Sequence, residues 1–116
     1  MKTFCFDLDG VICKTKKNNY KSAKPIKKII TLINKLYLNN KIIIFTARYM
    51  GRSGDRISEA KKKGYKLTKK QLTDWGLKYH KLIMGKPSYD VFIDDKNLEF
   101  KKNWYINFEK KFKKDF

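Results

Sequence analysis

Two aspartates lie one residue apart at the end of the apolar run FCFDLDG, residues 4–10. Side chains at positions i and i+2 of a strand point the same way, so Asp7 and Asp9 can both reach into one crevice. Burying carboxylates without partners is costly. The pair therefore indicates a site in which another charge, such as a hard cation, offsets the two carboxylates.

Other apolar runs along the chain also end in polar residues. These residues are Thr46, Lys86, Asp94 and Asp95. Since the carboxyl ends of parallel strands meet at one edge of a sheet, all of these groups would gather there. Three or four carboxylates repel one another unless a cation such as Mg²⁺ holds them. A hydroxyl and a lysine beside them suit the oxygens of a phosphoryl group.

The elements that must position these residues alternate along the chain. Short runs rich in apolar and β-branched residues predict buried strands at 2–9, 41–48, 79–85 and 89–95. Strands that alternate with helices predict an α/β fold, in which a parallel sheet carries helices on both faces.

Three helices are predicted between these strands and one after them. The first starts at Pro25, which suits a first helical turn, and its isoleucines recur at helical spacing as far as Tyr37. RISEAKKKGY (56–65) predicts a short helix that Gly64 closes. A separate helix starts at Thr68 with a capping-box pattern, and the fourth helix covers the C-terminal residues.

Length and composition favour one domain over residues 1–116. The apolar fraction of 41% is enough for a core. No apolar run is long enough for a membrane span, and acidic residues interrupt the first run where a signal peptide would be apolar. A cytoplasmic location is the expectation. Cys5 and Cys13 are too few for a zinc site or a disulfide framework.

The net charge of +18 raises the question of a polyanionic partner. However, only three of the 29 basic residues are arginines, and the lysines are spread along the whole chain. This distribution favours compositional bias with solvated lysine faces, and it argues against a nucleic-acid partner. A membrane surface or an anionic substrate stay open as alternatives.

The three arginines fall within nine residues of the loop after Thr46, at Arg48, Arg52 and Arg56. The planar guanidinium binds carboxylate or phosphate through two hydrogen bonds, which lysine cannot match. The cluster predicts recognition of an anionic group of a substrate. Surface ion pairs that tie the loop down are an equal alternative.

Aromatic residues recur every four positions in the basic C-terminal segment, about 98–116, and would line one helix face. They are Phe100, Trp104, Phe108, Phe112 and Phe116. Packing against the sheet or against another copy of the chain, as in a homo-oligomer, is one reading. A basic amphipathic helix on an anionic membrane, as a peripheral contact, is the other.

These motifs, in this order, resemble the haloacid dehalogenase (HAD) superfamily of phosphohydrolases. DLDG (7–10) is similar to the first motif, Thr46 to the second, Lys86 to the third and IDD (93–95) to the fourth. The resemblance implies a three-layer Rossmann-like fold. It also implies a phosphomonoesterase that works through an aspartyl-phosphate.

A narrower resemblance links the chain to small phosphatases encoded in bacterial capsule-biosynthesis loci. It rests on TAR (46–48), WGLKYHKLIMGKP (75–87) and FIDDK (92–96). It implies a sugar phosphate or a phosphorylated glycan precursor as substrate. A polynucleotide or nucleotide phosphatase, and a non-catalytic HAD-fold binding module, are the alternative functions.

The HAD resemblance also implies roles for single residues. Asp7 would attack phosphorus, and Asp9 would act as general acid and base. Mg²⁺ would be held by Asp7, by the main-chain carbonyl of Asp9 and by Asp94, while Asp95 would bind through water or hold Lys86.

The remaining positions would bind the substrate. Thr46, together with the lysine of the third motif, would bind the phosphoryl charge. Gly10, Ala47, Arg48 and Arg52 complete the expected substrate contacts.

Spacing leaves no room for a cap domain. Only 36 residues separate Asp9 from Thr46, and 39 separate Thr46 from Lys86. The elements predicted above fill both gaps. A large substrate or a neighbouring subunit is therefore expected to cover the site.

Overall fold

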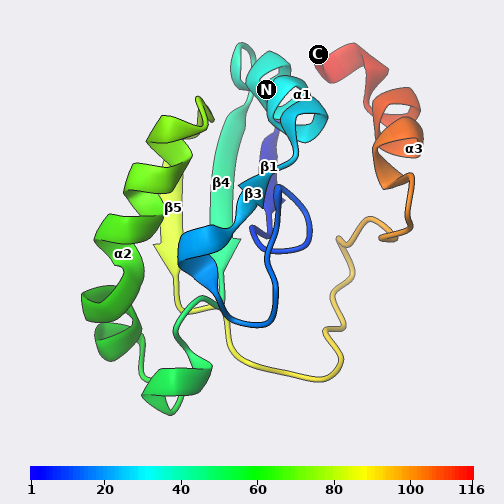
Figure 1. Cartoon of the computed structure of the whole chain (residues 1–116). Coiled ribbons are helices and arrows are strands. Elements are labelled where there is room, and N and C mark those ends of the chain that lie inside the picture. Colours follow the sequence, from blue (N-terminus) through cyan, green and yellow to red (C-terminus); the bar gives the residue numbers. More distant parts are fainter.

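A three-stranded parallel sheet forms the centre of the molecule (Figure 1). The computed structural model describes all residues, 1–116. The strands lie in the order β1 (Thr3–Phe6), β4 (Lys41–Thr46) and β5 (Lys81–Met84). Phe6 pairs with Ile44, and Thr46 pairs with Met84. The predicted α/β class and three of the predicted strands are confirmed.

Two long helices connect these strands. α1 (Lys27–Tyr37) joins β1 to β4 and lies against β4, while α2 (Ile57–Asp74) joins β4 to β5 and lies against β5. Both crossovers step in the same direction across the sheet, so right-handed connections place both helices over one face. No domain is inserted between the strands, in agreement with the absence of a cap.

Several short elements extend beyond the sheet. β2 (Cys13–Lys14) and β3 (Lys24–Pro25) form a small antiparallel pair, and η1 (Tyr20–Ser22) lies in the loop between them. η2 (Gly51–Ser53) follows β4, and η3 (Lys113–Asp115) lies near the C-terminus. The proline of β3 precedes α1, so the helix starts two residues later than predicted.

One face of the sheet carries the core. Ile42 and Ile44 of β4 are fully buried against Ile33 and Leu36 of α1. On the opposite face Cys5 and Ile83 are exposed. The predicted covering of both faces by helices is therefore not confirmed.

The two helices predicted at 56–65 and from Thr68 are wrong, because α2 is one continuous helix. Gly64 does not end it. A Cβ atom built at Gly64 would lie 2.1 Å from Cδ2 of Tyr49, so this position needs glycine for close packing. Thr68 is not an N-cap but a fully buried residue in the middle of α2.

The strand predicted at 89–95 is also wrong. These residues have no regular secondary structure, and Val91 and Ile93 are 74% and 92% exposed. β1 consequently forms the edge of the sheet. The apolar run FIDD therefore does not deliver its aspartates from a strand.

The aromatic C-terminal segment forms α3 (Trp104–Lys111), which lies beside β1 (Figure 1). Phe108 packs 5.6 Å from Phe4, and Trp104 packs 6.5 Å from Phe6, between ring centroids. Packing against the sheet, one of the two readings of this stripe, is what the structure shows. None of the helices is long and apolar enough to cross a membrane.

Replacing Gly64 with alanine tests the contact between α2 and Tyr49. A methyl group would normally favour the helix by about 1 kcal/mol, but here it must displace a buried ring. We expect the free energy of unfolding to fall by about 1–2 kcal/mol in urea titrations. Gly51→Ala is the control, because nothing lies within 4 Å of a Cβ built there. Equal stabilities for the two variants would contradict the packing.

Candidate functional site

Asp7 and Lys86 meet at the carboxyl ends of β1 and β5. Asp7 directly follows β1, and Lys86 lies two residues beyond β5. The carbonyl of Thr46 accepts hydrogen bonds from the N–H groups of Gly85 at 3.2 Å and Lys86 at 3.1 Å, which turns the chain towards β1. As a result, Lys86 Nζ lies 3.3 Å from Asp7 Oδ2.

The turn after β1 fixes the other oxygen of Asp7. Its Oδ1 accepts the N–H of Leu8 at 2.9 Å. Gly10 has φ of +87°, which a residue with a side chain rarely adopts, and its N–H donates to the carbonyl of Cys13 at 2.8 Å. Oδ2 of Asp7 is left facing Lys86.

Asp9 forms a bidentate ion pair with Arg48. Arg48 Nε donates to Asp9 Oδ2 at 2.9 Å, and Nη2 donates to Oδ1 at 3.0 Å. The Thr15 hydroxyl donates to the same Oδ1 at 2.5 Å. The Arg48 side chain is 0% exposed, whereas that of Asp9 is 26% exposed. Arg48 thus holds Asp9 from the protein interior, and the other side of Asp9 is open to the solvent.

Arg48 is itself held by α2 and by the loop before β3. Its Nη1 donates to Gln71 Oε1 at 2.5 Å and to Thr68 Oγ1 at 3.4 Å. Gln71 Nε2 donates to the carbonyl of Tyr20 at 2.7 Å, and the Tyr20 ring lies 5.1 Å from the guanidinium carbon. Arg48 therefore positions Asp9, and its buried guanidinium has no free face for a substrate.

Thr46 and Ala47 support this loop. Thr46 is 1% exposed, and its hydroxyl accepts the N–H of Arg48 at 3.1 Å. Ala47 is half-buried, and its carbonyl accepts the N–H of Met50 at 3.0 Å. Both residues lie at the predicted edge of the sheet, and these two hydrogen bonds are to the loop itself.

Lys86 is kept in its charged form. Burial on its own lowers the pKa of this lysine, but Tyr89 and the Asp7 carboxylate outweigh that effect and raise the pKa above its ordinary value. Lys86 is therefore a cation throughout the neutral range. Its pairing contributes stability that is lost only as the pH rises through this raised pKa.

Cys13 lies beside Asp9, but its thiol is unreactive. Its thiol is 3.4 Å from Asp9 Oδ1. Burial, followed by the charge of Asp9, raises the pKa of Cys13 to about 11. The group is a protonated thiol at neutral pH and not a nucleophile.

A cleft of about 1010 Å³ opens beside these groups. Asp7, Asp9, Gly10 and Lys86 line it, together with the segment after β5 and the aromatic face of α3. Asp94 also lines the cleft, on an exposed stretch where its Oδ1 accepts the N–H of Lys96 at 3.1 Å.

Three of the predicted magnesium ligands, Asp7, Asp9 and Asp94, line the same cleft. Nowhere do three carboxylate, thiol or imidazole side chains gather closely enough to hold a metal ion. Asp7 is paired with Lys86, Asp9 is held by Arg48, and Asp95 is exposed. Magnesium binding by Asp7 and Asp94 stays a prediction, and no reaction step below passes through a metal.

The remaining two arginines lie away from the cleft. Arg52 Nη2 donates to the carbonyl of Asn18, and Arg56 Nε donates to the carbonyl of Ser53 at 3.1 Å. Of the three arginines, Arg48 thus positions Asp9, Arg52 lies at a separate pocket, and Arg56 donates a hydrogen bond within its own loop.

Two supporting residues were not found from the sequence. Thr15 was one of several polar residues in a loop, and nothing in its spacing points to Asp9. In the sequence, Gln71 completes the capping-box pattern that starts at Thr68. Its position three residues after Thr68, on the same side of a helix, is a signal for a shared partner once α2 is continuous.

Removing the guanidinium should show that it is structural as well as functional. Arg48→Met leaves Asp9 beside a vacated buried site, so we expect the free energy of unfolding to fall by about 3 kcal/mol. Lys70→Met is the control. It removes the exposed ion pair with Asp74 (2.7 Å) and should change the free energy of unfolding by about 0.5 kcal/mol or less. Urea titrations of both variants measure the difference, and comparable losses would contradict the assigned burial.

Comparisons with known proteins extend to the fold alone. No protein-family model matches the chain, and no curated protein matches it. A crystal structure of a structural-genomics target from Vibrio cholerae has a similar fold, with a TM-score of 0.78 and 22% sequence identity. The similarity covers 96% of this chain and 99% of that one. The α/β architecture is therefore shared with a protein solved by crystallography.

Proposed function

We propose that this chain is a phosphomonoesterase of the HAD type, with Asp7 as its nucleophile. The observation that supports this most is the Asp7–Lys86 pair at 3.3 Å, one residue from the held carboxylate of Asp9, in a single cleft. A nucleophile, a cation and a second carboxylate that meet at the carboxyl ends of β1 and β5 suit phosphoryl transfer.

The first step forms an aspartyl-phosphate. A carboxylate oxygen of Asp7 attacks phosphorus in line with the ester oxygen, and the phosphorus–ester bond breaks. The mechanism requires Asp9 to take up a proton on its exposed side before this step, against the preference of the Arg48 ion pair for the carboxylate, and to give that proton to the departing alcohol oxygen. Lys86 stabilises the negative charge that spreads over the phosphoryl oxygens.

The second step returns the enzyme to its starting state. Asp9, now ionised, takes a proton from a water molecule whose oxygen attacks phosphorus. The bond between phosphorus and Asp7 breaks, which releases inorganic phosphate and the free carboxylate. Arg48 holds Asp9 in one orientation through both steps, because its two hydrogen bonds fix the plane of the carboxylate.

The finer assignments are part of the same proposal. They comprise the Rossmann-like HAD fold and a sugar phosphate or glycan precursor as substrate, in capsule biosynthesis. The motif order and the narrower sequence resemblance support them. An uncapped cleft that opens beside Asp7 is compatible with a bulky phosphate ester.

Asp7→Asn tests the nucleophile. The amide keeps the shape of the carboxylate but has no anionic oxygen, so steady-state phosphatase activity should fall at least about a thousandfold. Asp55→Asn, at an exposed aspartate outside the cleft, is the matched control and should keep full activity. Phosphate release above that limit in Asp7→Asn would remove Asp7 from this role.

Chelation tests the magnesium requirement implied by the resemblance. Asp7 and Asp94 share the cleft with one lysine, and a bound phosphate would add further negative charge. We therefore expect a chelator to abolish turnover and Mg²⁺ to restore it. Asp94→Asn should raise the Mg²⁺ concentration needed for half-maximal activity. Full turnover in chelator would rule out the metal.

A further inference from the structure

The cleft beside Asp7 and Lys86 is much larger than the group on which these residues act. Its volume is about 1010 Å³, far more than a phosphoryl group fills. Of its 22 lining residues, 12 are hydrophobic, and the aromatic ones come from β1, from the segment after β5 and from α3. Most of the cleft is therefore left for the alcohol part of the ester, and much of its surface is aromatic.

Tyr89 and Phe92 bring aromatic surface directly to the reactive groups. Lys86 Nζ lies 3.3 Å from Asp7 Oδ2 and 5.3 Å from the centre of each ring. The two ring centres are 5.0 Å apart, at an interplanar angle of 51°. Tyr89 is nevertheless 46% exposed and Phe92 is 41% exposed. Both rings thus offer open apolar surface next to the place where the phosphoryl group would bind.

Phe100 continues this surface towards α3. Its ring centre lies 6.0 Å from that of Trp104, which is itself buried and packs against Phe6. Phe100 lines the cleft but is 60% exposed. An exposed aromatic ring keeps apolar surface in water at a cost in free energy, and several such rings in one cleft are typical of a binding site for an apolar group.

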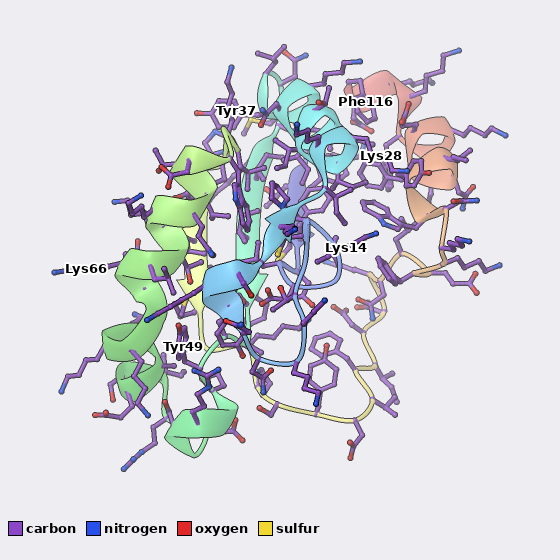
Figure 2. The ribbon with its side chains drawn as sticks, viewed as in Figure 1. Lys14, Lys28, Tyr37, Tyr49, Lys66 and Phe116 are labelled. Carbon is purple, nitrogen blue, oxygen red and sulfur yellow. The ribbon has the colours of Figure 1, made fainter.

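The helix that closes this side of the cleft is held in place. Phe108 of α3 packs against Phe4 and lies 6.2 Å from Phe116, between ring centroids. Lys28 Nζ donates to the Tyr105 hydroxyl at 2.7 Å, and Figure 2 shows Lys28 on the side of α1 that faces α3. Because α3 is tied to both β1 and α1, the aromatic surface is formed before a ligand binds, which lowers the entropy cost of binding.

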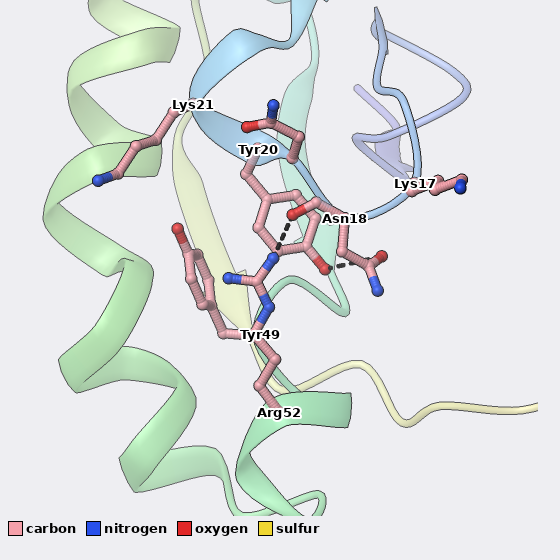
Figure 3. A pocket seen from close by; sticks show the side chains of 7 residues that line it. Lys17, Asn18, Tyr20, Lys21, Tyr49 and Arg52 are labelled. Atoms are coloured by element: carbon pink, nitrogen blue, oxygen red, sulfur yellow. Dashed lines mark hydrogen bonds between the residues drawn. The ribbon is translucent and has the colours of Figure 1, made fainter.

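The smaller pocket, of about 480 Å³, is not an extension of this cleft (Figure 3). None of its seven lining residues also lines the cleft. Figure 3 shows Lys17 and Lys21 extending away from Arg52, which donates a hydrogen bond to the carbonyl of Asn18. The alcohol part of a substrate bound at Asp7 therefore extends along the aromatic surface of the cleft.

We propose that the cleft binds an apolar group on the alcohol part of the substrate ester, and that Tyr89, Phe92 and Phe100 determine this specificity. The inference rests on the proposed phosphatase function and narrows its substrates. Of these three side chains, only the Tyr89 hydroxyl can form a hydrogen bond with a sugar hydroxyl. A sugar phosphate or glycan precursor therefore meets the requirement only if it carries an apolar group.

A matched pair of substrates tests the specificity. 2-Phenylethyl phosphate and ethyl phosphate are both esters of primary alcohols, so breaking the phosphorus–ester bond is chemically similar in the two. We expect the wild-type kcat/KM to be at least about tenfold higher for the phenyl ester, because the cleft buries its ring. Turnover of both esters with equal kcat/KM would overturn this inference and leave the phosphatase function intact.

Substitutions at exposed rings locate the preference. Phe92→Ser and Phe100→Ser should each lower the ratio of the two kcat/KM values about threefold to fivefold. The ratio cancels any loss that affects both esters equally, such as a displaced Lys86. Ile106→Ser is the matched control, because Ile106 is 48% exposed on α3 and does not line the cleft. A ratio that neither phenylalanine variant changes would reject the assignment.

A binding measurement separates this inference from the phosphatase function. 3-Phenylpropylphosphonate and propylphosphonate carry a methylene in place of the ester oxygen, so neither can be hydrolysed as an ester. Calorimetry with the wild-type protein should give a Kd at least about tenfold lower for the phenyl compound, and Phe100→Ser should reduce that difference. Preferential binding without turnover of either ester would reject the phosphatase but keep the apolar cleft. Equal affinities, or no binding of either phosphonate, would reject the cleft.

Discussion

The ion pair between Arg48 and Asp9 is the interaction on which the rest of the site depends. A guanidinium with a fully buried side chain is expensive to remove from water, and it is stable only when its donors are matched. Asp9, Thr68 and Gln71 provide those acceptors. They come from the turn after β1 and from α2, so one side chain ties together elements that are far apart in sequence.

This arrangement gives the two aspartates of the first turn different environments. Asp9 is fixed by two hydrogen bonds from Arg48 and one from Thr15. Asp7 has a local backbone donor and a lysine at 3.3 Å, and its side chain is 36% exposed. A held carboxylate suits repeated proton transfer, and an exposed one beside a cation suits attack on an anionic ester. The division of roles thus follows from where each side chain finds its partners.

Local signals predicted the central sheet well. The apolar runs that end at Phe6, Thr46 and Met84 became parallel strands, because each is buried on at least one side and matches its neighbour in register. Strand ends then brought Asp7, Thr46 and Lys86 to one edge without further information. This part of the site depends on topology and could be predicted.

Long-range packing decided the features that were not predicted. Gly64 looked like a helix end, but a tyrosine from the loop after β4 lies where its side chain would be. VFI (91–93) has strand-forming residues, yet β1 takes no partner on that side and the segment stays exposed. Arg48 looked like a substrate contact because its type suits anions, and only the fold shows that its anion is Asp9. None of these outcomes is encoded within a few residues.

Trapping the covalent intermediate tests the central claim most directly. Rapid mixing of wild-type protein with substrate, followed by quenching with borohydride, reduces an acyl phosphate to an alcohol. Mass spectrometry of the digested protein then locates the change. The account predicts conversion of Asp7 to homoserine in the wild-type protein and no such conversion in Asp7→Asn. A phosphorylated side chain other than Asp7 during turnover would contradict it.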